Sequence, residues 1–222
     1  MLSTREEEQS HWLSRGILFG KNRILQVIIT AFTLIWIYLA IKPYSRYDWV
    51  LENLLIWAAV VFLAVMYRFF RFSNLSYLLI AIFLYLHAVG AHYSYNENIV
   101  DVWMKQLFHA KRDNFDRVVH FSYGLLLAYP LREALKVWTK LGNAWLNVLT
   151  CMIILATGAF YELIEMWVAM IVAPEIGTLF LGTQGDPWDS QHDMELALYG
   201  SILAMVVAAV VRRIRLNAYP HS

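Results

Sequence analysis

Long apolar runs separated by short polar stretches are the feature of this sequence that most restricts its fold. A helix needs about 20 apolar residues to cross the hydrocarbon core of a bilayer. Runs of that length recur along the chain, and 59% of its 222 residues are hydrophobic, whereas a soluble domain has about half. The sequence therefore predicts an all-α, polytopic helical membrane bundle that forms a single integral membrane domain over residues 1–222.

About six runs are expected to cross the membrane. They cover residues 24–41, 50–67, 75–93, 116–135, 144–172 and 193–211. The fourth run is the least apolar and contains Pro130, which indicates a helix shielded from lipid by its neighbours. A short interfacial helix is expected around residues 102–108. Residues 1–22 are polar and show no cleavable signal peptide, so they are expected to form a cytoplasmic segment before a retained first span.

The distribution of Lys and Arg predicts which way the bundle faces, because cytoplasmic loops carry an excess of both. If the N terminus is cytoplasmic, twelve Lys and Arg residues lie on the cytoplasmic side, namely Arg5, Arg15, Lys21, Arg23, Arg68, Arg71, Arg132, Lys136, Lys140, Arg212, Arg213 and Arg215. Six lie on the other side, namely Lys42, Arg46, Lys105, Lys111, Arg112 and Arg117. This bias predicts that both termini are cytoplasmic. The segment between the fifth and sixth spans has no Lys or Arg, as a translocated loop should.

With this topology, ionisable side chains gather toward the extracytoplasmic ends of four spans. They are His87 and His92 on the third span, Asp116 and His120 on the fourth, Glu162 and Glu165 on the fifth, and Asp189, His192 and Asp193 at the start of the sixth. A charged side chain deep in a bilayer costs several kcal/mol unless it faces protein or water. The sequence therefore predicts that these groups share one outward-facing polar pocket.

Sequence spacing indicates which of these groups share a helix face. Asp116 and His120 are four residues apart and can touch, and the two glutamates of the fifth span are three apart. His87 and His92 are five apart and point in different directions, so at most one of them is expected to join the pocket. An ordinary explanation also exists for Asp116, which could cap the fourth helix.

The segment GTLFLGTQGDPWDSQHD, residues 177–193, links the last two spans. Its glycines permit tight turns, and Pro187 prevents a helix from running through it. We expect this segment to lie over the mouth of the bundle and to bring Gln184, Asp186 and Asp189 near the carboxylates. Turn formation and helix capping are the ordinary explanations for the two aspartates.

Three motifs carry a resemblance to a known family. They are HFSYG at residues 120–124, FYELIEMW at 160–167 and LGTQGDPWDSQHDM at 181–194. The chain resembles the YjdF family of bacterial inner-membrane proteins, a domain of unknown function, and the resemblance implies a multi-pass protein of the bacterial inner membrane with no assigned activity. A more distant resemblance to VanZ-like membrane proteins rests on Asp plus His at the entry to one helix, a later glutamate and an Asp-rich entry to the last span. The Asn that usually follows that Asp pair is missing from residues 194–200, so no role in glycopeptide tolerance is carried over.

The first functional hypothesis is a divalent-metal site. One histidine with several carboxylates suits Mg²⁺, Mn²⁺ or Zn²⁺, and a bound metal could polarise a phosphoryl or acyl group and activate water. The expected metal ligands are His120, Glu162, Glu165 and Asp193. The expected supporting residues around them are Asp116, which would orient His120, and His87, Gln184, Asp186 and His192. If the site is catalytic, the candidate residues are Glu162, Glu165 and Asp189, and the ligand would be a lipid or an envelope-linked molecule.

Two other function classes stay open beside this one. A proton- or cation-coupled transporter or channel would use buried Asp, Glu and His as relays, although the cytoplasmic half of the bundle is expected to lack matching charges. A non-catalytic protein would bind a lipid headgroup or a partner. The single cysteine, Cys151, excludes an intramolecular disulfide and a Cys-based metal centre. The net charge of +1 gives no basis for a nucleic-acid partner.

Overall fold

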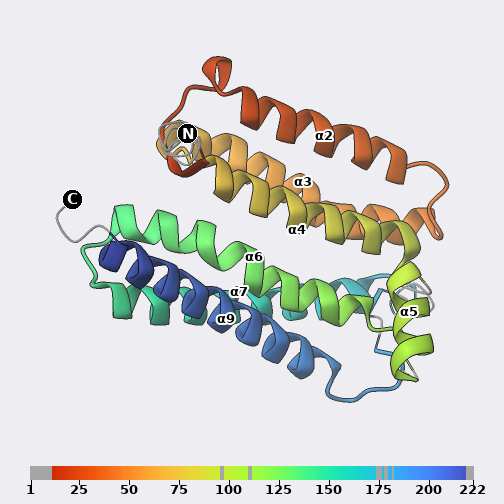
Figure 1. Ribbon diagram of the computed structural model, residues 1–222. Coiled ribbons are helices and arrows are strands. Elements are labelled where there is room, and N and C mark those ends of the chain that lie inside the picture. Colours follow the sequence, from red (N-terminus) through yellow and green to blue (C-terminus); the bar gives the residue numbers. More distant parts are fainter. Residues whose placement is uncertain are drawn as a thin grey trace.

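The computed structural model describes residues 12–95, 98–109, 112–173, 177, 180–181 and 183–218. Within these residues the long helices are α2 (Arg23–Leu39), α3 (Arg46–Phe69), α4 (Asn74–Tyr93), α6 (Phe115–Trp138), α7 (Asn143–Ile171) and α9 (Asp189–Ala218). A 3-10 turn, η1 (Phe19–Lys21), precedes α2, and the short helix α5 (Ile99–Phe108) lies across one end of the bundle (Figure 1). The predicted all-α class is confirmed.

Length and composition identify the helices that could cross a membrane. Four helical segments are long and apolar enough, namely α3, α4, α7 and residues Asp189–Ile214 of α9. α2 is apolar but has 17 residues. α6 has 24 residues and lies between α4 and α9 along the bundle (Figure 1), but it is not among the helices that meet both criteria. The chain is a polytopic helical membrane protein.

Each expected span falls on one of these helices, but several helices begin earlier because side chains cap them. Ser45 accepts a hydrogen bond from the Asp48 backbone N–H at 3.3 Å and starts α3 four residues before the expected span. Asn22 caps α2 in the same way by accepting from the Leu25 backbone N–H at 3.1 Å. These caps satisfy backbone donors that a helix leaves free at its start. Residues 1–11 of the expected cytoplasmic segment lie outside the described residues.

The long helices form two layers of three. α2, α3 and α4 make one layer, α6, α7 and α9 make the other, and α4 packs on α6 where the layers meet (Figure 1). Successive long helices run antiparallel. The beginning and the end of the described chain therefore lie at the same end of the bundle, opposite α5 (Figure 1). We call the other end, where α5 lies, the α5 end.

The closest helix contact, between α6 and α9, depends on two glycines. A Cβ atom on Gly124 would lie 1.8 Å from the Ala197 carbonyl oxygen, and one on Gly200 would lie 2.2 Å from the Phe121 carbonyl oxygen. Ala197 is fully buried in the same contact. Small residues at such crossings let two helix backbones approach closely within a membrane. This packing fixes the position of α9 relative to α6.

The end opposite α5 also contains a carboxylate, that of Glu133. The cytoplasmic half of the bundle is expected from its sequence to lack charges that match those of the α5 end, and Glu133 is an exception to this expectation. This side chain on α6 accepts hydrogen bonds from the Ser73 backbone N–H at 3.0 Å and the Ser73 hydroxyl at 2.9 Å, and also from the Ser76 hydroxyl. Arg15 lies 3.7 Å from it. Because Ser73 caps α4, Glu133 ties α6 to the start of α4 and has a structural role.

Candidate functional site

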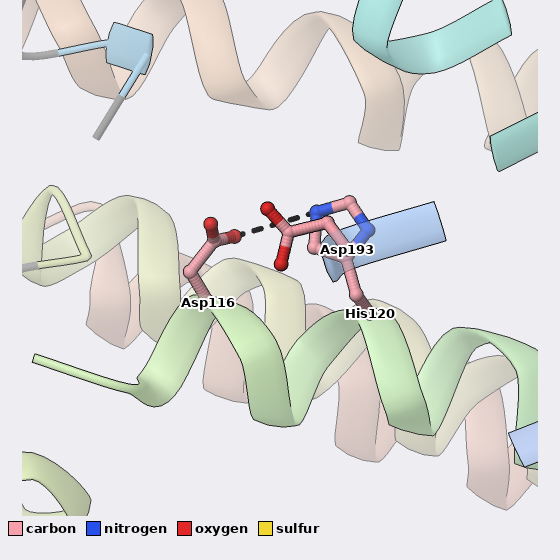
Figure 2. Close-up of side chains that lie close together, drawn as sticks. All are labelled: Asp116, His120 and Asp193. Atoms are coloured by element: carbon pink, nitrogen blue, oxygen red, sulfur yellow. Dashed lines mark ion pairs between the residues drawn. The ribbon is translucent and has the colours of Figure 1, made fainter. Parts of the chain in front are cut away.

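Three side chains from two helices converge at the α5 end. Asp116 and His120 lie one turn apart on α6, and Asp193 reaches them from the first turns of α9 (Figure 2). Asp116 Oδ1 lies 3.5 Å from His120 Nε2. One ligand atom from each of the three side chains lies within 4.8 Å of the others, and this is the group among the described residues that could hold a metal ion.

A third helix adds a carboxylate to this group. Glu162 of α7 places its Oε1 atom 3.7 Å from His120 Nε2. Its carboxyl group also interacts with the Ser190 hydroxyl at the start of α9. The histidine nitrogen therefore lies near two carboxylates that come from different helices. We call Asp116, His120, Glu162 and Asp193 the α6–α9 cluster.

The α6–α9 cluster contains buried oxygen atoms without hydrogen bonds. Glu162 Oε1 and Asp193 Oδ1 have no hydrogen-bond partner among the described residues, and Asp193 is only 2% exposed. A buried carboxylate without a partner is strongly destabilised. Such atoms in a native fold require a proton, a water or an ion as their partner.

The small-residue packing of α6 and α9 explains why these side chains meet. Asp116, His120 and Gly124 are each four residues apart and share one face of α6. On α9, Asp193 and Ala197 are also four apart and face α6. Asp116, His120 and Asp193 of the α6–α9 cluster therefore lie on the same helix faces as the small residues where α6 and α9 touch.

A cavity of about 470 Å³ adjoins the cluster. It lies between α3, α4, α6 and α7, and Asp116 and His120 of the cluster contribute to its wall. The other polar residues that line its α5 end are Glu52, His87, Ser94, Tyr95, Tyr161, Glu165 and Gln184. Glu165 thus faces the same space as the cluster, one helical turn beyond Glu162.

A second polar group on this wall surrounds His87. Its Nε2 atom lies 2.9 Å from the Glu52 carbonyl oxygen, and its Nδ1 atom lies 2.6 Å from the Tyr95 hydroxyl. Burial raises the pKa of Tyr95 well above its usual value, so the hydroxyl stays protonated and donates to Nδ1. The tautomer with a proton on Nε2 follows, and that proton is donated to the carbonyl. The Glu52 side chain is 3% exposed, and its Oε2 atom has no hydrogen-bond partner among the described residues.

Sequence reasoning missed Glu52, Tyr95 and Tyr161 as lining residues. Glu52 carried a usable signal, because it is an ionisable residue inside an apolar run and such residues are functional candidates by default. Tyr95 lies in the turn after α4 and reaches His87 because its ring packs over Gly90, where an added Cβ would lie 2.4 Å from the ring. That turn has positive φ at Ser94 and Tyr95, and no pattern in the sequence predicts it.

The aspartates of the segment before α9 are held by two arginines. Asp189 Oδ1 accepts from Arg112 at 2.7 Å, and Asp186 Oδ2 accepts from Arg117 at 2.5 Å and lies 3.0 Å from His192 Nδ1. A hydrogen bond from the Trp188 backbone N–H, followed by His192 and Arg117, lowers the pKa of Asp186. The two arginines come from the polar segment before α6 and from its first turn. From the sequence alone, both arginines count only as charges of a loop.

Gln184 also bonds the segment before α9 to the residues before α6. Its Oε1 atom accepts from the Asp113 backbone N–H at 2.9 Å, and its Nε2 atom donates to the Asp113 carbonyl at 3.3 Å. Gln184 has a positive φ of 49° and also lines the cavity. Gln184, Asp186 and Asp189 are therefore bonded to the residues just before α6 and in its first turn. Residues 174–176, 178–179 and 182 lie outside the described part.

The structure therefore separates the sequence-derived candidates into three sets. Asp116, His120, Glu162 and Asp193 form the cluster, Glu165 and His87 line the adjoining cavity, and Asp186, Asp189 and His192 belong to the arginine-bound segment. His92 lies apart from all of them, because its Nδ1 atom is 2.7 Å from the Leu39 carbonyl oxygen.

Comparison with known proteins places the chain in a family. The profile of a family described as a predicted membrane protein, DUF2238, matches residues 24–214. The chain belongs to this family. It is also 33% identical over 190 residues to the inner membrane protein YjdF of Escherichia coli strain K12, and the match covers 85% of this chain and 90% of that protein. No solved structure matches the chain.

These matches confirm the resemblance to the YjdF family. The DUF2238 match includes α3, α4, α6 and α7 in full and α9 as far as residue 214, and it therefore contains all four residues of the α6–α9 cluster. The likeness to an inner-membrane protein and the apolar helices make this chain a multi-pass inner-membrane protein. The distant likeness to VanZ-like proteins is not tested by these matches.

Proposed function

We propose that the α6–α9 cluster binds one divalent cation, Mg²⁺, Mn²⁺ or Zn²⁺, in a pocket that faces the extracytoplasmic side of the membrane. Asp116, His120 and Asp193 are the ligands of this proposal, and Glu162 completes the set. Asp116 thus becomes a ligand in place of Glu165, whose side chain we assign to the adjoining cavity.

The observation that carries this proposal is the spacing around His120 Nε2. Its carboxylate neighbours Asp116 and Glu162 lie at 3.5 and 3.7 Å, beyond the roughly 2.7–3.2 Å of a hydrogen bond. Ligand atoms about 2.1 Å from a tetrahedral metal lie about 3.4 Å from one another. These two distances suit ligands of one ion, and the ligand atoms of Asp116, His120 and Asp193 lie within 4.8 Å of one another. The unpartnered oxygens of Glu162 and Asp193 would supply negative charge to hold the ion.

A divalent cation at this position could polarise a phosphoryl or acyl oxygen and lower the pKa of a bound water. Glu165 lies one turn from Glu162 on the cavity wall, where it could take a proton from such a water. We assign no catalytic role to Asp189, because Arg112 already binds its carboxylate. The proposed activity is chemistry on, or binding of, a lipid or envelope-linked molecule.

The transport hypothesis has less support. A proton or ion path would need polar groups along the bundle to the opposite end. Beyond the α5 end, the described lining of the cavity is almost entirely apolar, with Met66, Phe72 and Trp138 at its far end. Glu133 at that end is occupied by hydrogen bonds to the start of α4.

Metal binding to purified protein tests the proposal. The protein in detergent is stripped with a chelator, dialysed against Mn²⁺ and analysed for bound metal. We expect about one ion per chain in the wild type and a loss of at least tenfold in Asp193→Asn, since one lost charged ligand costs over about 1.4 kcal/mol of binding. The matched control is Glu195→Gln, which removes an exposed carboxylate two residues along α9 and should bind as the wild type does. Equal, near-zero metal in all three proteins would remove the proposal.

A further inference from the structure

The cavity beside the cluster is longer than a metal site requires. Its volume of about 470 Å³ lies within the roughly 300–1,000 Å³ of ligand pockets in proteins. On α3 its wall extends from Glu52 to Met66, a helical rise of about 21 Å. On α6 it extends from Asp116 to Trp138. The cavity therefore runs along the bundle through much of a hydrocarbon core about 30 Å thick.

The polarity of the cavity changes along its length. Carboxylates and histidines line the α5 end, whereas the walls beyond it are formed mostly by Leu, Ile, Phe and Ala side chains of α3, α4, α6 and α7. Leu55, Ala59 and Leu63 represent this wall on α3, and Leu127 and Leu131 represent it on α6. An apolar space that ends at a polar cluster fits a molecule with a hydrocarbon chain and a polar head.

The cavity also reaches the lipid-facing surface. Phe62 of α3 and Phe160 of α7 both line it, yet they are 59% and 55% exposed. α3 packs mainly against α4, and α7 packs against α6 and α9. Both α3 and α7 lie behind α4 and α6 in Figure 1, and residues of both helices line the cavity. A ligand that enters between them comes from the bilayer.

The side chains at the polar α5 end of the cavity determine which polar head group can bind there. Glu52, Asp116 and Glu165 line it, and no Lys or Arg contributes to the described lining. These carboxylates would repel a phosphate unless a cation lay between them, and divalent ions bridge carboxylates and phosphates in this way. We infer that the cavity binds a lipid whose hydrocarbon chain ends in a phosphate, entering between α3 and α7 with its phosphate on the cation of the α6–α9 cluster. This inference rests on the proposed metal site.

Photocrosslinking tests the occupant. Mn²⁺-loaded protein in lipid nanodiscs is exposed to two probes with a diazirine in the chain, a phosphatidic acid and a polyprenyl phosphate, and to the matching chain alcohol. Peptide mass spectrometry then locates the label. We expect label on the lining residues of α3 and α6 with a phosphate probe, and loss of that label with the alcohol or with EDTA. The phosphate probe that gives more label shows whether the cavity prefers a glycerolipid or an isoprenoid lipid.

Two matched variants show whether the label is in the cavity. Ala59→Trp fills the cavity from α3 and should reduce the label about tenfold, because the added indole occupies the space of the hydrocarbon chain. Ala58→Trp adds the same side chain at an exposed neighbour that does not line the cavity and should leave the label unchanged. Leu131→Trp fills the cavity from α6 as a second blocking variant, and a size-exclusion profile of each variant checks folding.

The outcomes separate this inference from the metal proposal. Label that persists in both folded blocking variants, or that is equal with the alcohol, overturns the lipid inference. If the protein binds Mn²⁺ but shows no cavity label, the lipid inference alone fails. If it binds no Mn²⁺ and the label is insensitive to EDTA, the metal proposal fails and the phosphate–cation arrangement fails with it.

Discussion

At the scale of residues, the two histidines of the α5 end have different surroundings. Both ring nitrogens of His87 have partners at hydrogen-bond distance, the Glu52 carbonyl and the Tyr95 hydroxyl. His87 Nε2 also lies 3.6 Å from the Glu52 carboxylate, but on the same residue as its carbonyl partner. His120 Nε2 lies 3.5 and 3.7 Å from two carboxylates, Asp116 and Glu162, that come from different helices. A histidine with both nitrogens bonded is fixed in place, whereas one with a nitrogen aimed at separated carboxylates can coordinate an ion. This difference supports a structural role for His87 and the proposed ligand role for His120.

Tyr95→Phe tests the structural role of the His87 group. The substitution leaves the buried Nδ1 atom without a donor, which costs about 1–3 kcal/mol. We expect the Tm in detergent to fall by about 5 °C, with Mn²⁺ binding unchanged. Tyr44→Phe, at a tyrosine that is 72% exposed, is the control and should keep the wild-type Tm. Equal melting of the two variants would mean that the Tyr95–His87 bond contributes nothing.

At the scale of elements, the contact between α6 and α9 positions the cluster. Gly124 and Gly200 bring the two backbones together, and Asp116, His120 and Asp193 extend from the same faces. In a membrane, close packing of this kind supplies much of the association between helices. Any change that moves α9 away from α6 should therefore also separate the carboxylates.

Gly200→Ala tests this contact. The new Cβ would lie 2.2 Å from the Phe121 carbonyl oxygen, so α9 must move, at a cost of about 1–3 kcal/mol. We expect a Tm about 5 °C lower together with weaker Mn²⁺ binding. Gly158→Ala is the matched control, because Gly158 also lies inside a helix and an added Cβ there comes no closer than 3.9 Å to the neighbouring side chains. A Gly200→Ala protein with wild-type stability and metal binding would contradict the packing argument.

The elements were easier to predict from the sequence than their contacts. Apolar runs fix where helices form, because the bilayer requires every backbone group to be bonded internally. The spacing of Asp116 and His120 likewise predicts their contact, since it depends on one helix. By contrast, the pairs Arg112–Asp189 and Tyr95–His87 join different elements through irregular turns. Sequence periodicity does not determine such turns, so these partners appear only in the structure.

At the scale of the whole molecule, the layered arrangement collects the polar groups at one end. Successive long helices are antiparallel (Figure 1), so the ends of α4 and α7 and the starts of α3, α6 and α9 meet beside α5. Lipid excludes isolated charges, and this end brings Glu52, His120, Glu162 and Asp193 out of lipid together. The middle of the bundle is left mostly apolar and can adjoin the bilayer.

The orientation of this end decides which compartment supplies the ligand. The excess of Lys and Arg at the opposite end predicts that the α5 end is extracytoplasmic. Cysteine labelling can test this, because the single native cysteine, Cys151, is only 8% exposed. In spheroplasts, a membrane-impermeant maleimide should label Gln106→Cys, an exposed position on α5, and should label Leu141→Cys, exposed between α6 and α7, only after the membrane is permeabilised. The reverse pattern would place the cluster on the cytoplasmic side, and the cation and the lipid phosphate would then have to come from the cytoplasmic compartment and leaflet.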